Sequence, residues 1–295
     1  MSNNKNLQRA RESPNDEFYT FYKDVELEME HYKKYFVDKI VYCNCDDINS
    51  NFWKYFYNNY HKLQLKKLIA SHYDKDKSSF VLVYDGNNIN HIDLQGNGDF
   101  RNRECDKFYS ECDIIVTNPP FSLFRDYFDR LIEFDKQFLV IGNRNCAVYK
   151  NTFPLFMNRR VCFGYNQVKE FLTSDDVIKK FGNTCWITNL PVYKNKRLSL
   201  SKHYYDENGI AMSDVYPMYD NYNAINVDRL KDIPIDYEGV MGVPITFFDF
   251  CDSKGGGFEV IGLDRYTIPA DRLIGGRSAI AGKPKYARVF IRKFV

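Results

Sequence analysis

The sequence predicts an α/β protein with a parallel sheet covered by helices on both faces, followed by a less regular region. Two observations lead to this prediction. Between residues 24 and 142, short apolar runs of strand length alternate with amphipathic segments of helical period, joined by short links. After about residue 150 this alternation stops, and residues 198–237 are polar, rich in Tyr and Asn, and without a clear period.

The elements of the first half follow in order. Amphipathic spacing predicts helices at 24–35, 51–63 and 123–134. Apolar runs predict strands at 39–47, 65–73, 80–84, 113–117 and 137–142, and the turn-rich segment 85–98 is expected to be a hairpin or a loop. In sheets of this kind ligands bind at the carboxyl ends of the strands, so the polar residues that come after each run are of interest.

The second half predicts strands at 160–165, 184–189, 243–250, 258–263 and 286–294. We therefore expect a disordered arm at 1–15, a main domain at 16–199 and a further region at 200–295. A chain of 295 residues has room for these parts.

The charge balance argues against a strongly basic nucleic-acid binder, because the net charge is only +2. Residues 271–295 nevertheless hold seven basic residues and one acid, a local net charge of +6. This segment is either a solvated face or, for a nucleic-acid substrate, a phosphate contact. Its expected DNA-binding residues are Arg277, Lys285, Arg288 and Arg292.

No apolar run approaches the roughly 18 residues of a membrane helix, and the N-terminal segment has no apolar signal core. We therefore expect a cytoplasmic protein with reduced thiols. Cys43 and Cys45 would point the same way on a strand, but no second pair completes a zinc site, so buried thiols are favoured and no metal is expected.

The strongest local signal is the tetrapeptide Asn118-Pro119-Pro120-Phe121, which directly succeeds the apolar run 113–117. As structure alone it is a strand stop and a turn. Two prolines also stiffen the backbone and leave its carbonyls free to accept hydrogen bonds. The Asn118 side chain and the Pro119 carbonyl can hold a ring-bound amino group, whose lone pair then becomes nucleophilic, while Phe121 offers a flat face to the ring. The pattern favours methyl transfer to a planar amine.

The tetrapeptide alone leaves three acceptors open: adenine in DNA, guanine or adenine in RNA, and a glutamine side chain in release factors. Further blocks narrow the choice. Besides Thr117–Arg125, they are Asp16–Thr20, Val41–Asp47, Tyr219–Asp228 and Gly239–Phe247. In this order, and over about residues 15–295, the chain resembles the EcoRI adenine-specific DNA methyltransferase family.

The resemblance implies a Rossmann-like fold that binds S-adenosyl-L-methionine, with a C-terminal DNA target-recognition region. It implies methyl transfer to the N6 amine of an adenine that is flipped out of duplex DNA. It assigns Asn118, Pro119, Pro120 and Phe121 to catalysis and adenine binding. The expected cofactor-binding residues are Phe18, Tyr19, Thr20, Cys43, Asp46, Asp47, Asp74, Asp99 and Phe100.

One departure from the wider class concerns the loop after the first strand, which is usually rich in glycine. Here the loop is Asn44-Cys45-Asp46-Asp47. Asp46 and Asp47 either contact the ligand or cap the next helix. Tyr19, Tyr165 and Tyr193 are alternatives for the ring that faces Phe121 across the base.

The implied setting is a restriction–modification system or an orphan methylase, with duplex DNA as substrate, a restriction endonuclease as a possible functional partner, and a monomer as the expected state. Two rival functions stay open. One is an RNA or protein methyltransferase that uses the same pocket, and the other is a DNA-binding protein with a decayed methylase fold.

Overall fold

A computed structural model describes residues 18–74, 79–173, 175–194, 198, 200–250 and 257–294. The predicted arm at 1–15 lies outside the described residues. The chain forms two compact units: the first runs to Arg144 and includes Phe163–Pro191, and the second consists of Asn145–Cys162 and the chain from Val192 onward. Residues 145–162, which the sequence prediction placed with the first domain, thus belong to the second unit.

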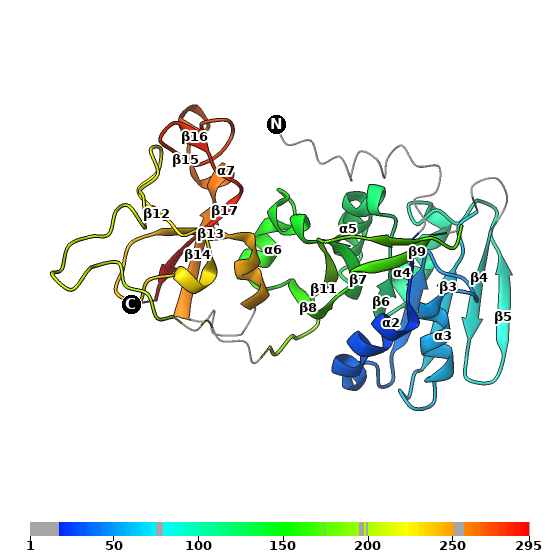
Figure 1. Ribbon diagram of the computed structural model, residues 1–295. Coiled ribbons are helices and arrows are strands. Elements are labelled where there is room, and N and C mark those ends of the chain that lie inside the picture. Colours follow the sequence, from blue (N-terminus) through cyan, green and yellow to red (C-terminus); the bar gives the residue numbers. More distant parts are fainter. Residues whose placement is uncertain are drawn as a thin grey trace. The chain divides into compact units, whose positions relative to one another are not determined.

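The first unit is built on an eight-stranded sheet with the order β5-β4-β3-β2-β6-β7-β11-β8 (Figure 1). In chain order its strands are β2 (Ile40–Asn44), β3 (Lys67–Ser71), β4 (Phe80–Tyr84), β5 (Ile89–Asp93), β6 (Ile114–Thr117), β7 (Gln137–Asn143), β8 (Cys162–Gln167) and β11 (Thr184–Thr188). The strands predicted at 39–47, 65–73, 80–84, 113–117 and 137–142 are all present, with ends shifted by a few residues.

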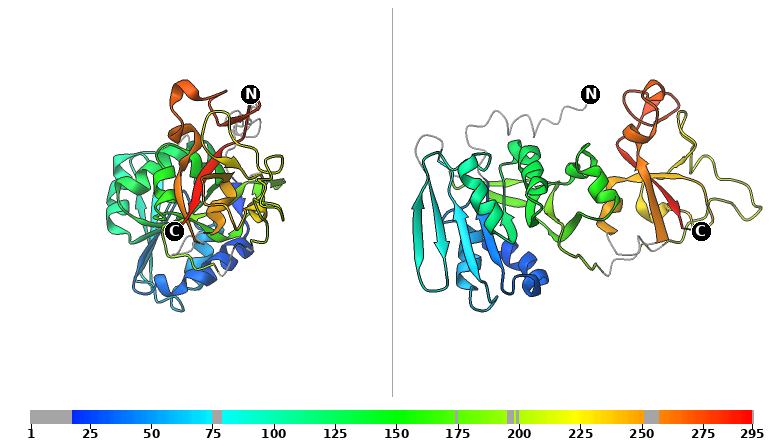
Figure 2. Two further views of the ribbon diagram at one scale, coloured as in Figure 1. Left: turned by 90° about the vertical axis from the view of Figure 1, so that its left-hand side faces the viewer. Right: turned by 180° about the vertical axis from the view of Figure 1, so that it is seen from behind.

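The sheet is mixed rather than fully parallel, which corrects the sequence prediction. The neighbours β3, β2, β6 and β7 run parallel, whereas β4 and β5 add an antiparallel hairpin at one edge and β11 pairs antiparallel with β7. The hairpin strands stand at the outer edge in Figures 1 and 2. Parallel neighbours need a crossover of about a dozen residues or more, and the link between β3 and β4 is shorter.

The helices of this unit are α2 (Tyr22–Met29), α3 (Asn51–Asn58), α4 (Asp106–Glu111) and α5 (Phe124–Glu133), with short 3₁₀ turns η1 (Glu30–Tyr35), η2 (Arg103–Cys105) and η3 (Phe121–Leu123). Ser50 caps α3, because its hydroxyl accepts from the Trp53 amide at 3.0 Å. Crossovers between parallel strands are right-handed, and β3 and β7 lie on opposite sides of the β2–β6 pair, so α3 and α5 cover opposite faces.

A small antiparallel sheet of three strands also belongs to the first unit. It comprises β1 (Phe18–Thr20), β9 (Glu170–Thr173) and β10 (Ile178–Lys180), in the order β1-β9-β10. Sequence patterns did not predict these strands, since each has only three or four residues. The pairing of β1 with β9 fixes residues 18–20 through backbone hydrogen bonds to residues that are far away in the sequence.

The second unit holds a four-stranded sheet with the order β12-β13-β17-β14 (Figure 2). Its elements are α6 (Phe153–Met157), β12 (Ile225–Asn226), η5 (Leu230–Asp232), β13 (Met241–Pro244), η6 (Ile245–Phe250), β14 (Phe258–Leu263), α7 (Asp264–Thr267), η8 (Ala270–Arg272), β15 (Ala279–Ile280), β16 (Lys283–Pro284) and β17 (Arg288–Lys293); η4 (Arg144–Val148) bridges the unit boundary. The strand predicted at 243–250 ends at Pro244 and continues as η6.

Three further findings concern the cysteines, metal sites and membrane-spanning helices. Six of the described cysteines are free thiols, but Cys162 is disulfide-bonded, which differs from the expectation of reduced thiols. Within the described ranges no cluster of three His, Cys, Asp or Glu side chains has the geometry of a metal site. No helix among the described residues has the length and apolar character needed to cross a membrane.

Candidate active site

Several of the predicted site residues lie at the topological switch point of the sheet, between β2 and β6. β2 and β6 are neighbours, and the chain proceeds from β2 to β3 on one side and from β6 to β7 on the other. At such a switch point the loops after the two strands diverge and leave a crevice for a ligand. The loop Asn44–Asp47 comes after β2, and the tetrapeptide Asn118–Phe121 comes after β6, so the loop that lacks glycine and the strongest sequence signal lie at this one point.

A hydrogen-bonded contact joins the two loops. The Thr117 hydroxyl oxygen lies 2.6 Å from Asp46 Oδ2 and also contacts the Asn44 carbonyl. A hydroxyl has one hydrogen, and both partners only accept when Asp46 is ionised. Both contacts are hydrogen bonds when Asp46 keeps its proton and donates it to Thr117. Burial agrees with this: it raises the pKa of Asp46 to about 7 against the lowering by the Thr117 and Ser50 hydroxyls.

Asn118 is the polar residue at the end of β6. Its amide nitrogen donates to the Phe18 carbonyl at 2.5 Å, so strand β1 holds the side chain in one orientation. Its carbonyl oxygen Oδ1 is buried and has no hydrogen-bond partner in the described part of the chain. A buried acceptor without a partner costs about 1–3 kcal/mol. Such an atom is expected where a ligand supplies the missing donor.

Phe121 lies in a cluster of four phenylalanine rings. Phe18 stacks on it, with ring centroids 5.4 Å apart and planes at 23°, while Phe171 and Phe181 meet it edge-on. The ring stacked directly on Phe121 is therefore Phe18, whereas Tyr19, Tyr165 and Tyr193 were predicted as partners across a bound base. Tyr165 instead stacks on His31, with centroids 3.9 Å apart. Phe18 is known from the sequence only as part of the N-terminal block, and its stacking role depends on the β1–β9 pairing.

The loop without glycine adopts a backbone that glycine ordinarily provides. Cys45 has φ 68°, in the left-handed region. Asp47 caps the turn that leads into α3, because its Oδ1 accepts from the Asn49 amide at 2.8 Å and the Ser50 amide at 3.1 Å. Cys43 is fully buried within β2, which places its thiol in the core. Asp47 thus stabilises the turn before α3, whose N-cap is Ser50, and Asp46 contacts Thr117 at the end of β6.

The second group of predicted cofactor residues is held together by Asn97, which the sequence analysis missed. The Asn97 carbonyl accepts from the Asp74 amide at 3.0 Å, and its side-chain oxygen accepts from the Asp99 amide at 3.2 Å. Gly98 lies between them with φ 76°, and a Cβ there would come within 2.0 Å of the His72 carbonyl oxygen. Only glycine fits this approach, which brings Asp99 beside the end of β3.

Asp99 is an ionised, paired carboxylate. Its oxygens accept from the Arg101 backbone amide and Nε at 2.9 Å and from Nη2 at 2.6 Å. Burial alone would raise the pKa of Asp99, but the hydrogen bonds and positive charge of Arg101 outweigh it and lower the pKa below its ordinary value. These bonds occupy three of about four acceptor positions of a carboxylate, which leaves one for a ligand donor. The predicted neighbour Phe100 is buried, with its ring edge-on to Tyr127.

Buried polar side chains hold the end of β2 in place. Asn44 is fully buried, donates to the Tyr109 hydroxyl at 2.6 Å and accepts from the Tyr127 hydroxyl. Helices α4 and α5 supply these two tyrosines, so the three hydrogen-bonded side chains fix the end of β2 against both helices. Neither tyrosine was a sequence-based site residue, since an aromatic residue at helical spacing indicates only a core position.

Comparison with known proteins decides the family. The family model described as "Adenine-specific methyltransferase EcoRI" matches residues 6–87 and 76–293, which together cover nearly the whole chain. The chain belongs to the EcoRI adenine-specific methyltransferase family. The resemblance drawn from the sequence blocks is therefore confirmed.

Curated relatives of this family agree over almost their full length. The chain is 39% identical to the type II methyltransferase M.EcoRI of Escherichia coli, covering 98% of this chain and 96% of the relative. It is 34% identical to M.MpnI of Mycoplasma pneumoniae and 33% identical to M.MgeORF184P of Mycoplasma genitalium, both named type II methyltransferases, over 97% of this chain and 97% and 98% of theirs. No solved structure matches significantly.

In this member of the EcoRI methyltransferase family, four of the seven basic residues of the C-terminal segment are ion-paired. Arg288 is buried and pairs with Asp228 at 2.7 Å, which corrects the expectation that it is a free phosphate contact. The other three expected DNA-binding residues are also ion-paired: Arg277 with Asp264 at 3.3 Å, Lys285 with Asp228 at 3.9 Å, and Arg292 with Glu259 at 2.5 Å. In sequence these pairs are invisible, because all the acids lie outside residues 271–295.

Proposed function

We propose that this protein is a site-specific DNA methyltransferase that transfers a methyl group from S-adenosyl-L-methionine to the N6 amine of an adenine flipped out of duplex DNA. The family and its named relatives support DNA methylation and adenine as the base. The residues of the first unit support the finer statements about the pocket and the donor.

The observation that carries the proposal is the buried, partnerless Oδ1 of Asn118 in the described part of the chain. An amine on a planar ring has two N–H donors, and we propose that one is accepted by this oxygen and the other by the Pro119 carbonyl, which a proline-stiffened backbone holds in place. Two acceptors draw the nitrogen away from ring conjugation and leave its lone pair nucleophilic. Because the acceptors are fixed before the reaction, little reorganisation is needed in the transition state.

The aromatic cluster supports a base as the acceptor. The stacking of Phe18 on Phe121 demonstrates that a flat ring packs on this phenylalanine. We propose that a flipped adenine takes a stacked position on Phe121, either on the free part of the ring or after displacement of Phe18. Extrusion of a base from the duplex costs a few kcal/mol, which stacking and the two hydrogen bonds offset.

The residues present also fit S-adenosyl-L-methionine. When bound, this cofactor supplies an electrophilic methyl group. The Thr20 hydroxyl is buried and has no hydrogen-bond partner among the described residues, which leaves a polar atom for a ligand on strand β1. Phe18, Tyr19, Thr20 and Asp46 would border the methionine end, and Asp74, Asp99 and Phe100 the nucleoside end. Asp47 would contribute indirectly, by stabilising the turn before α3, and Cys43 by packing in the core of the sheet.

A methyl-transfer assay tests the proposal. The protein is incubated with methyl-labelled cofactor and, separately, with duplex DNA of random sequence, single-stranded RNA and a release factor. We expect label only in duplex DNA, and N6-methyladenine after nucleoside digestion and mass spectrometry. Label only in RNA or in a glutamine side chain would establish the first rival function. Duplex binding without any transfer would establish the second, a decayed methylase.

The biological setting is part of the same proposal. We propose a role in restriction–modification or as an orphan methylase, acting as a monomer in the cytoplasm and paired in function with an endonuclease where one is present. Size-exclusion chromatography with light scattering tests the monomer. Protection of methylated DNA against a co-encoded endonuclease tests the pairing.

A further inference from the structure

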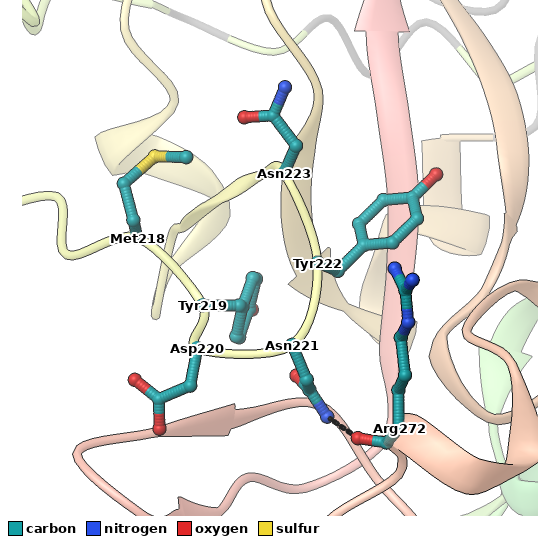
Figure 3. Close-up of a pocket in the computed structure, with 7 residues that line it drawn as sticks. All are labelled: Met218, Tyr219, Asp220, Asn221, Tyr222, Asn223 and Arg272. Carbon is teal, nitrogen blue, oxygen red and sulfur yellow. Dashed lines mark hydrogen bonds between the residues drawn. The ribbon is translucent and has the colours of Figure 1, made fainter.

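The second unit contains an open hollow of about 600 Å³, formed by residues 218–223 and Arg272 (Figure 3). Its size lies within the range of small-ligand sites in proteins. The hollow lies wholly within the second unit and shares no residue with the candidate active site. Residues 219–223 belong to the sequence block Tyr219–Asp228, and Arg272 belongs to the basic segment 271–295.

The floor of the hollow is rigidly held. The Asn221 amide nitrogen donates to the carbonyls of Arg272 and Arg277, both at 2.9 Å, and its side-chain oxygen accepts from the Ala279 amide at 3.1 Å. Asp220 accepts from the amides of Ala281 and Gly282 at 3.1 and 2.7 Å. These two side chains are used to tie the loop to η8 and to the β15–β16 hairpin, so they fix the position of their neighbours.

A planar aromatic wall stands on this floor. The Tyr222 ring stacks on the buried Phe290 ring, with centroids 4.3 Å apart and planes at 6°. Phe290 belongs to the core cluster with Tyr219, Ala224 and Ile268. The core therefore holds the Tyr222 ring in place.

Two side chains of the hollow, Arg272 and Asn223, are of types that recognise bases in DNA. In the described part of the chain, Arg272 has no acidic partner, in contrast to the four ion-paired residues Arg277, Lys285, Arg288 and Arg292. Figure 3 shows its guanidinium pointing toward the Tyr222 side of the hollow, with Asn223 and Met218 at the other end. Asn223 is exposed, and no hydrogen bond of its side chain occurs within the described ranges.

We infer that this hollow reads the edge of a base pair in duplex DNA, with Arg272 as the specificity-determining residue. The inference rests on the proposed function, since it supplies the sequence readout that a site-specific methyltransferase needs. A guanidinium fork binds guanine O6 and N7 in pairs, an asparagine amide binds adenine in the same way, and an exposed methionine contacts the thymine methyl. Arg272 presents the first of these chemistries from η8, and Asn223 and Met218 present the other two from the loop that Asn221 ties to η8.

Phosphate binding alone would not need this arrangement. A phosphate contact needs a positive charge or an N–H donor and carries no sequence information, whereas base reading also needs a fixed position, and Asn221 holds the backbone of Arg272 at its carbonyl. Lys283 supplies the contrasting case: it is exposed, lies on the β15–β16 hairpin, and has no acidic partner in the described residues. Lys283 does not line the hollow, so the variant Lys283→Ala is a matched control that removes one positive charge outside it.

The test is the methylation motif. The full-length protein is incubated with S-adenosylmethionine and a duplex library of random sequence, and single-molecule sequencing reports each methylated adenine with its flanking bases. We compare the wild type with Arg272→Ala, Arg272→Lys and Lys283→Ala. For both Arg272 variants we expect the preference at one base-pair position to fall by about 5- to 150-fold, because lysine keeps the charge but loses the fork. Lys283→Ala keeps the wild-type motif.

The outcomes separate the two proposals. A wild-type protein that methylates no duplex refutes the proposed function. A wild type with a defined motif, and Arg272 variants with the same motif and only a uniform loss of rate, refutes the base-reading inference, and in that case retention of rate by Arg272→Lys identifies a phosphate contact. Circular dichroism of each variant excludes unfolding as the cause of a changed motif.

Discussion

Asp46 and Asp99 were both expected to bind the cofactor, yet their surroundings shift their pKa values in opposite directions. Asp46 is almost fully buried between hydroxyl groups, and burial raises its pKa to about 7. Asp99 follows the turn-rich segment 85–98, and the hydrogen bonds and charge of Arg101 lower its pKa against the effect of burial. Asp46 therefore takes up a proton at a higher pH than Asp99 does.

This difference shows how two acids of the same type can have different roles when their neighbours differ. The Asp46 carboxyl is hydrogen-bonded to Thr117, the residue directly before Asn118, and so helps to fix the end of β6. An ionised Asp99 keeps one acceptor position for a donor on a ligand. When two titratable groups have pKa values pushed apart, their environments assign their roles. Mutations at and around the two acids test this contrast, from the largest expected effect to the smallest.

Asn118 sets the scale, because both acids act at a distance from the proposed acceptor amine. Asn118→Ala removes the buried acceptor and the bond to Phe18, and we expect the turnover rate to fall by about 10²–10³-fold. Affinity for the cofactor and the unfolding transition change little. Single-turnover methylation of duplex DNA measures the effect, with Asn58→Ala, an exposed asparagine at the end of α3, as the control. Near-normal turnover would remove Asn118 from the catalytic role.

Asp46 is tested by the pH dependence of stability. Its folded pKa lies above the ordinary 3.8, so its stabilisation is complete below pH 3.8 and is lost as the pH rises through about 7. We expect the free energy of unfolding of the wild type to fall over this range relative to Asp46→Asn, which does not titrate, by up to about 1.4 kcal/mol per pH unit. Urea unfolding at a series of pH values measures the difference.

The asparagine variant also keeps a donor for the Thr117 hydroxyl, whereas Asp46→Ala does not. At pH 5 we expect Asp46→Ala to lose about 1–3 kcal/mol of unfolding free energy and Asp46→Asn to lose less. Parallel stability curves for wild type and Asp46→Asn between pH 4 and 7 would show that Asp46 is ionised, and the contrast with Asp99 would not hold.

Asp99→Ala should weaken cofactor binding more than it slows the saturated rate, because the nucleoside end lies away from the reacting methyl group. We expect a dissociation constant raised about tenfold or more, the value of one hydrogen bond to a charged group. Calorimetric titration with S-adenosylmethionine measures it. Asp93→Ala, at an exposed acid on edge strand β5, is the matched control. Equal affinities of wild type and Asp99→Ala would exclude Asp99 from the site.

The smallest effect concerns the loop that lacks glycine. Cys45 adopts φ 68°, a conformation that costs a side chain about 1–2 kcal/mol, but glycine loses about 0.5–1 kcal/mol in backbone entropy. We expect Cys45→Gly to change the unfolding free energy by less than about 1 kcal/mol, measured by urea unfolding. Cys43→Gly, in the buried strand β2, serves as the comparison and should destabilise the protein clearly more. A similar loss in both variants would mean that the Cys45 thiol, rather than its backbone, holds the loop.

Several features of the fold could be predicted from local sequence. The strands β2, β3, β4, β6 and β7 and the helices α3 and α5 were expected, because buried strands are continuous apolar runs and these helices carry a strong apolar period. The mixed character of the sheet was missed, since the direction of β4 depends on the length of a link rather than on the pattern within the strand. The strands β1, β9 and β10 are too short to have a pattern of their own.

For the site, the sequence by itself determined the proposed catalytic tetrapeptide and the family, because two prolines and a fixed order of blocks are properties of the chain. Only the tertiary structure decided which ring stacks on Phe121, which acid has a raised pKa, and which basic residues of the described chain remain free of acidic partners. These outcomes depend on groups far apart in sequence: Phe18 reaches Asn118, Thr117 reaches Asp46, and Asp228 neutralises Arg288. Burial and pairing are properties of the neighbours, and local sequence does not contain them.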